Sequence, residues 1–270
     1  MNLYRSPNPH FVEKKADHSI ITLLYDAHTH LPKHENQTLR SSNSSATLPN
    51  STQRKYSIVN GTSPANWSAV LQFARNRLEV LPAIGLHPQQ VVEAPADWKA
   101  TFLQLLAENP TCSIGEIGLD RRYQTDHFEK QLDAFSWQLQ QASKQNRPVS
   151  IHCVKAIGLL METLRSDNLP SRGVHLHAYT GPVELIPELV KRGAYFSFAA
   201  MQLKSRSTKI PDRIRAIPID RLLVETDTYY EQNASELINC YVSISEIHGI
   251  SLNLLAESIE DNFKRYFFTC

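Results

Sequence analysis

Short apolar runs rich in β-branched residues recur along the chain, and each is followed by a longer segment in which apolar residues return every three or four positions. The runs predict strands at 20–26, 56–60, 80–86, 112–119, 149–152, 173–177, 194–198 and 222–225. The longer segments predict helices at 66–77, 96–108, 126–145, 156–165, 182–192, 211–216, 234–248 and 251–268. The pattern therefore predicts strands and helices that alternate eight times.

The predicted strands are too apolar to face water on one side, which favours parallel strands covered by helices. Eight strand-helix units predict an α/β fold of the (β/α)₈ TIM-barrel type. We expect a single domain over 1–270, with its core at about 20–268 and an N-terminal extension at 1–19. The segment 33–55 interrupts this pattern, because 13 of its 23 residues are Ser, Thr, Asn or Gln. It predicts a polar flexible loop, either over the mouth of the barrel or as a linker without function.

Composition and charge narrow the class of protein. The 270 residues include 28 basic and 27 acidic ones, so the chain does not hold nucleic acid by bulk charge. No apolar run approaches the roughly 18 residues of a membrane span, and the first residues lack a secretory signal. The four cysteines are scattered without a CxxC pair, which is typical of reduced thiols. We therefore expect a cytoplasmic protein with no membrane contact and no obligate protein partner.

The first predicted strand ends in Asp-Ala-His-Thr-His, which places His28 and His30 two positions apart. Alternate residues of a strand point to the same side, so both imidazoles can reach one metal ion. Imidazole is a common ligand of Zn²⁺ and of other borderline metals. Taken alone, such a pair is more often two surface or core histidines than a pair of metal ligands.

Other predicted strands also end in ligand-type side chains. Glu116 lies inside an apolar run, where an unpaired charge costs several kcal/mol, so either an arginine or a metal must meet it. His152, His177 and Asp227 come at the ends of the fifth, sixth and eighth runs. Because catalytic residues of barrels lie at the C-terminal ends of the strands, these side chains are expected at one rim. His175 is interpreted as a structural residue.

Ordered motifs along the chain resemble those of the TatD family of metal-dependent hydrolases. They are DAHTHL at 26–31, GLHP at 85–88, GEIGLD at 115–120, PVSIHC at 148–153, HAYTG at 177–181, LLVETD at 222–227 and Asn-Phe at 262–263. The resemblance runs from about 24 to 267 and implies a (β/α)₈ barrel with two divalent metals. It also implies deoxyribonuclease activity, often of the 3′–5′ exonuclease type on single strands.

Carried over residue by residue, the resemblance implies that one metal is bound by His28, His30, Glu116 and Asp227. It implies a second metal at Glu116, His152 and His177, with Glu116 bridging. Two metals about 3.5–4 Å apart can activate a water and clamp the attacking and leaving oxygens. Asp227 would orient or deprotonate that water, so Asp227 and Glu116 are the candidate catalytic residues. The donor set suits Zn²⁺, Mn²⁺ or Co²⁺, and the family also includes Mg²⁺-dependent members.

These observations predict a divalent-metal-dependent hydrolase, and we favour a phosphodiesterase or deoxyribonuclease of the 3′–5′ exonuclease type with DNA as substrate. The alternative is a dinuclear hydrolase of amide, ester or lactone bonds in small molecules, because the same site can polarise a carbonyl. A third reading is a non-catalytic binding protein stabilised by metal. Structural metals are commonly held in closed, cysteine-rich sites, which this pattern does not resemble.

Substrate contacts are predicted more weakly than metal ligands. His87, Lys155 and Tyr179 follow predicted strands and could meet a phosphate or a base. Further candidates in similar positions are Arg121, Arg122, Tyr123, Tyr229 and Tyr230. Three segments depart from the family pattern. Val-Lys stands at 154–155 where relatives often carry Arg-Asp, and Thr-Tyr-Tyr at 228–230 where they usually carry Ala-Pro-Tyr. The polar segment 33–55 replaces the usual first helix. The metal positions are intact, so metal hydrolysis is predicted more firmly than DNA cleavage.

Overall fold

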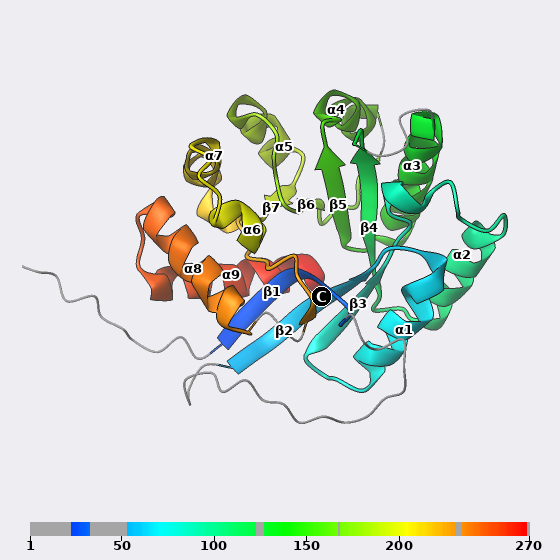
Figure 1. Cartoon of the computed structure of the whole chain (residues 1–270), viewed down its shortest axis with the longest axis horizontal. Helices are drawn as coiled ribbons and strands as arrows, with labels where there is room; N and C mark the ends of the chain where they lie inside the picture. The colour runs from blue at the N-terminus through cyan, green and yellow to red at the C-terminus, as the bar shows by residue number, and fades with distance from the viewer. Residues whose placement is uncertain (1–22, 33–52, 123–126, 167, 231–233, 269–270) are drawn as a thin grey trace, which may run out of the picture.

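A parallel sheet of seven strands forms the centre of the described part of the protein. The computed structural model describes residues 23–32, 53–122, 127–166, 168–230 and 234–268. The strands follow one another in the sheet in chain order, each parallel to the next. They are β1 (Leu23–His30), β2 (Gln53–Gly61), β3 (Val80–Ile84), β4 (Ser113–Asp120), β5 (Val149–Val154), β6 (Val174–Leu176) and β7 (Ala194–Phe196). The sheet curls, and helices cover its outer side (Figure 1). The fold is α/β and TIM-barrel-like.

The prediction of an eighth strand at 222–225 is wrong for the described residues, although the segment lies where that strand would be. Isolated parallel bridges join Leu222 to Phe196 of β7 and Tyr229 to His30 of β1. The Asp26 side chain, rather than a strand carbonyl, accepts the hydrogen bond from the Thr226 N–H, at 3.1 Å. A continuous ladder is thereby replaced by single contacts that still connect β7 to β1.

The helices follow the predicted pattern closely. They are α1 (Pro64–Arg75), α2 (Trp98–Glu108), α3 (Phe128–Gln145), α4 (Ile157–Ser166), α5 (Ile186–Lys191), α6 (Ala200–Leu203), α7 (Lys209–Ala216), α8 (Ala234–His248) and α9 (Leu252–Phe267). α9 begins after Ser251, whose hydroxyl accepts the Leu254 N–H at 3.2 Å as an N-cap. The short helix α6 was not predicted. None of the described helices combines the length and the apolar character needed to cross a membrane.

The polar segment predicted as a loop at 33–55 ends earlier than expected. Residues 53–55 belong to β2, where the backbone pairs with β1 while the Lys55 side chain is exposed to water. A polar composition is therefore compatible with a strand at this point, because pairing uses main-chain groups. The rest of the segment, 33–52, and the N-terminal extension 1–19 lie outside the described residues.

Two buried glutamines of α3 hold the backbone where β3 and β4 diverge after two paired positions. The Gln138 side chain accepts the Leu86 N–H at 2.7 Å and donates to the Leu86 carbonyl at 3.2 Å. The Gln131 side chain accepts the Asp120 N–H at 2.9 Å and donates to the Asp120 carbonyl at 3.1 Å. The two residues lie two helical turns apart and so share a face of α3. This helix therefore supplies the hydrogen bonds that a neighbouring strand would otherwise make.

Replacing Gln138 with Met is expected to lower the free energy of unfolding by about 2 to 4 kcal/mol, because each buried polar group left without a partner costs about 1–3 kcal/mol. Both main-chain groups of Leu86 lose their partner in this variant. Urea unfolding monitored by circular dichroism measures the effect. Gln140→Met is the matched control, since Gln140 lies on the exposed side of the same helix. Equal stabilities of the two variants would contradict this role of Gln138.

Candidate metal centre

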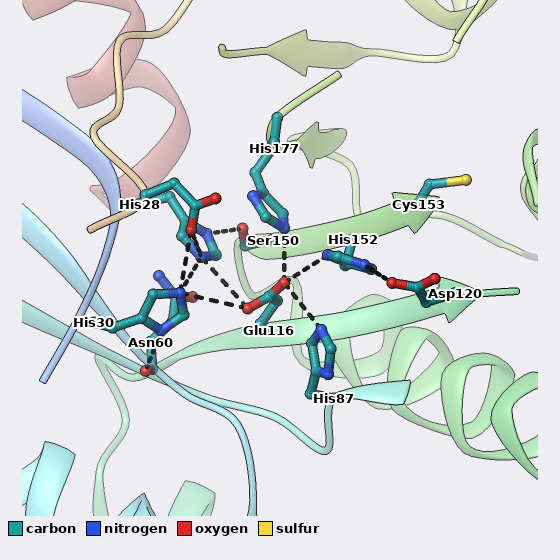
Figure 2. A network of polar contacts seen from close by, with 12 residues as sticks. His28, His30, Asn60, His87, Glu116, Asp120, Ser150, His152, Cys153 and His177 are labelled. Atoms are coloured by element: carbon teal, nitrogen blue, oxygen red, sulfur yellow. Dashed lines mark hydrogen bonds and ion pairs between the residues drawn. The ribbon is translucent and has the colours of Figure 1, made fainter. Parts of the chain in front are cut away.

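Glu116 of β4 lies at the centre of a cluster of histidines (Figure 2). Its side chain is buried, and its two carboxylate oxygens face different groups. Oε1 lies 2.8 Å from Nδ1 of His152 and 2.9 Å from Nε2 of His177. Nε2 of His87 is 3.4 Å from the same oxygen. This side of the carboxylate is thus met by side chains from β5 and from the segments that follow β6 and β3.

The other oxygen of Glu116 faces the end of β1. Oε2 lies 3.6 Å from Nε2 of His28 and 3.7 Å from Nε2 of His30. The two Nε2 atoms are 3.3 Å apart, as expected for alternate residues of one strand. Oδ1 of Asp227 lies 3.3 Å from Nε2 of His30 and 3.9 Å from Nε2 of His28. The structure therefore brings together the six side chains predicted from the strand ends.

The chemistry of these contacts fits a divalent cation. Burial and, to a smaller extent, the neighbouring His177 lower the pKa of His28 to about 3, so the His28 imidazole is neutral. Its Nδ1 lies 2.8 Å from the Ser150 hydroxyl; with the proton there, Nε2 directs a lone pair toward Oε2 of Glu116. A lone pair that faces a carboxylate oxygen is repulsive unless a cation or a proton lies between them. Imidazole and carboxylate are the donors that Zn²⁺, Mn²⁺ and Co²⁺ accept.

Asp120 is a residue of the site that the sequence analysis missed. Its carboxylate lies 2.9 Å from Nε2 of His152 and accepts hydrogen bonds from the Arg122 guanidinium at 2.7 and 3.1 Å. Burial acts to raise the pKa of Asp120, but the hydrogen bonds from His152 and Arg122 outweigh it and hold that pKa well below its usual range. The resulting anion fixes the His152 ring with Nδ1 toward Glu116. Asp120 and Glu116 are four positions apart on one strand, so their side chains are expected on the same side of it. That spacing could have indicated Asp120 from the sequence.

Glu225 is a second missed residue, and it is fully buried behind the cluster. It accepts hydrogen bonds from the Ala178 N–H at 2.8 Å and from the Ser197 hydroxyl at 2.6 Å. The same hydroxyl lies 2.6 Å from Nε2 of His175, which agrees with a structural role for that histidine. Burial and the nearby charge of Asp227 raise the pKa of Glu225 well above its usual range. Glu225 thus holds the segment after β6 that carries His177.

A cleft of about 850 Å³ opens over the cluster, and its walls include His30, Glu116, His152, His177 and Asp227. Water and a substrate can therefore reach Asp227 and His30 at the edge of the cluster, whereas Glu116 is almost completely covered. The short helix α6 and the residues that follow it form part of the far wall.

The weaker candidates for substrate contact are distributed unevenly around this cleft. His87 and Arg122 line it, whereas Lys155 and Tyr179 line an adjoining cavity. Tyr230 lies elsewhere, since its ring packs edge-on against Phe73 of α1.

The remaining candidates do not line the cleft or lie outside the described residues. The Arg121 guanidinium lies over the Phe128 ring, 4.6 Å from its centroid. Tyr229 pairs through its backbone with His30. Tyr123 is outside the described residues.

Comparisons with known proteins agree with this geometry. The family model of TatD-related DNases matches residues 25–268. The uncharacterized metal-dependent hydrolase YcfH of Escherichia coli K12 is 27% identical over 222 residues, which cover 79% of this chain and 83% of YcfH. The 3′-5′ ssDNA/RNA exonuclease TatD of Shigella flexneri is 30% identical over 176 residues, 64% of this chain and 67% of that protein.

A solved structure has the same fold. The crystal structure of YjjV, a TatD homologue from Escherichia coli K12, superposes with a TM-score of 0.79 at 24% identity, over 92% of this chain and 98% of YjjV. The chain therefore belongs to the TatD family of metal-dependent hydrolases.

Proposed function

We propose that this protein is a phosphodiesterase that removes nucleotides from the 3′ end of single-stranded DNA with the help of two divalent cations. One observation carries the proposal: the two oxygens of the buried Glu116 face two separate groups of nitrogen and oxygen donors. Such an arrangement is typical of a carboxylate that bridges two metals. The name of the Shigella relative, a 3′-5′ ssDNA/RNA exonuclease, supports the choice of a nucleic-acid substrate.

The residues present divide into two ligand groups around Glu116. His28, His30 and Asp227 would hold one cation together with Glu116, and His152 and His177 would hold the other, also with Glu116. When bound, a pair of divalent cations stabilises the charge that develops on a phosphate and makes water a stronger acid.

Asp227 would accept the proton of the attacking water. Its side chain is 30% exposed, whereas Glu116 is almost completely covered, so Asp227 is the carboxylate that solvent in the cleft can reach. A general base must lie within hydrogen-bond reach of the proton that it removes. The hydrogen bond with His30 holds the Asp227 carboxylate in place for this transfer.

His87 would act as a hydrogen-bond donor in the cleft. Its Nδ1 accepts the Gln89 N–H at 3.1 Å, so in the neutral ring the proton is on Nε2. His87 lines the cleft, and its Nε2 atom lies 3.4 Å from Oε1 of Glu116. It can donate to Glu116 or to a phosphate oxygen of the substrate, which supports the sequence-based prediction for this residue.

The proposal is tested by stripping the protein with a chelator and reloading it with Zn²⁺, Mn²⁺, Co²⁺ or Mg²⁺. We expect about two equivalents of metal per chain, as in other dinuclear sites. A single-stranded oligonucleotide labelled at its 5′ end should shorten stepwise and release 5′-nucleotides, most rapidly at low ionic strength, where contacts to phosphates are strongest. Absence of phosphodiester cleavage with all four metals, together with hydrolysis of a carboxylic ester or lactone, would contradict the proposal.

A further inference from the structure

An apolar cavity of about 320 Å³ lies beside the cleft, and the proposed reaction gives it no role. It is bounded by the end of β5, the start of α4 and the segment after β6. Its apolar lining includes Ile151, Cys153, Ile157, Leu160, Leu176 and Tyr179. This volume is at the lower end of the range for small-ligand sites, about 300–1,000 Å³.

The cavity and the cleft are neighbours that share part of their lining. Cys153, Val154, His177 and Thr180 border both spaces. His177 lies 2.9 Å from Glu116, so a group in the cavity is next to the candidate metal centre. The two spaces are therefore adjacent.

The wall formed by residues 179–182 is held in place by hydrogen bonds. The Arg213 guanidinium of α7 donates to the carbonyls of Thr180 and Gly181, at 2.6 and 2.7 Å. The Tyr179 hydroxyl donates to the Pro182 carbonyl at 2.8 Å. A Cβ at Gly181 would lie 2.5 Å from the Tyr179 hydroxyl oxygen, so the tight packing requires glycine there. The cavity is consequently preformed, which lowers the entropy cost of filling it.

Lys155 adds a positive charge at the border of this apolar space. It lines the cavity, yet its side chain is exposed to solvent. Within the described ranges, its ammonium group makes no hydrogen bond or ion pair, in contrast to Arg122 and Arg213. An apolar interior with one unpaired cation at its edge suits a ligand that has a planar apolar part next to an anionic part. A nucleotide has this combination.

We propose that the cavity binds the base of the 3′-terminal nucleotide, with Lys155 facing a phosphate of the same strand. This inference rests on the proposed phosphodiesterase function and adds to it the site of substrate recognition. The apolar side chains supply faces against which a base of any sequence can pack, in the way that proteins hold single strands without reading sequence. The exposed lysine supplies the electrostatic part of the contact.

The test compares two oligonucleotides that differ only in the 3′-terminal nucleotide, which carries either adenine or an abasic tetrahydrofuran. For the metal-loaded wild type we expect KM to be roughly 10-fold lower with the base present, the size of effect that one stacked base contributes. Ile157→Trp places a larger side chain of α4 in the cavity. It should raise KM for the oligonucleotide that ends in adenine to the KM of the abasic oligonucleotide. Glu162→Trp is the matched control on the exposed side of α4 and should behave as the wild type.

Two further measurements separate binding from turnover. Isothermal titration of the chelator-treated protein with deoxyadenosine monophosphate should show binding that Ile157→Trp removes and Glu162→Trp retains. Lys155→Ala should weaken the same binding and Lys155→Arg should preserve it. If circular dichroism shows that the tryptophan variant is not folded, Ile157→Phe is used instead, because phenylalanine fills less of the cavity.

The possible results distinguish the two proposals. Equal KM values for the adenine and abasic ends in the wild type, or equal behaviour of Ile157→Trp and Glu162→Trp, would overturn the base site while the phosphodiesterase proposal stands. Cleavage of neither oligonucleotide, nor of bis(p-nitrophenyl) phosphate, with any of the four metals would overturn the phosphodiesterase and the base site that rests on it. Cleavage of bis(p-nitrophenyl) phosphate alone would overturn the base site and the choice of DNA, but not the metal chemistry.

Discussion

Glu116→Gln is expected to reduce hydrolysis by more than about 100-fold and to reduce the bound metal below two equivalents. Residues that only support a ligand cost about 10–100-fold in metal affinity or activity when they are changed, and Glu116 contacts both halves of the candidate centre directly. Glutamine keeps the shape of the side chain but presents one oxygen and one amide NH₂ group. The NH₂ group cannot serve as a ligand, so one of the two donor groups around Glu116 loses its shared oxygen.

Elemental analysis after gel filtration and the oligonucleotide assay measure the two effects separately. Glu162→Gln serves as the control, because Glu162 is exposed on α4 and belongs to neither donor group. Circular dichroism reports whether the barrel is intact. Retention of two equivalents of metal with normal hydrolysis in Glu116→Gln would rule out a bridging carboxylate.

The candidate metal ligands at the C-terminal ends of the strands could be predicted from the sequence, because two repeating patterns indicate where they lie. Alternation of strands and helices predicts parallel strands whose C-terminal ends share one edge, and parity within a strand predicts which side chains face the same way. His28 and His30 satisfy both conditions on β1, and their Nε2 atoms are 3.3 Å apart in the structure. Glu116, His152 and Asp227 converge on the same point from strand ends far apart in the chain.

The supporting contacts could not be predicted in this way, because they depend on which distant groups are left unpaired. Gln131 and Gln138 lie beside the apolar stripe of α3 and look like ordinary polar positions of an amphipathic helix. Their partners, the backbones of Asp120 and Leu86, become visible only when β3 and β4 are seen to diverge. The prediction of an eighth strand was wrong for a related reason. An apolar run at 222–225 is necessary for a strand, but its register with β7 and β1 determines whether a ladder forms.

Asp227→Asn is expected to lower kcat by about 10²- to 10⁴-fold, the usual contribution of a positioned general base. The substitution is well suited to the question because Asp227 has a φ of 52°, a left-handed conformation that asparagine tolerates better than most other residues. The amide oxygen can also still accept the hydrogen bond that Oδ1 makes with His30, 3.3 Å away. The backbone and the main contact are thus retained, and what is lost is the negative charge and the ability to take a proton.

Steady-state kinetics on the oligonucleotide should therefore show a fall in kcat that is much larger than any change in KM, while the unfolding temperature of the chelator-treated protein stays close to that of the wild type. Asp212→Asn is the control, since Asp212 is an exposed residue of α7 that pairs with Arg215 on the same helix. A large loss of thermal stability in Asp227→Asn would instead assign the carboxylate to holding β1 and the segment after 222–225 together. An unchanged kcat would remove Asp227 from the proton transfer.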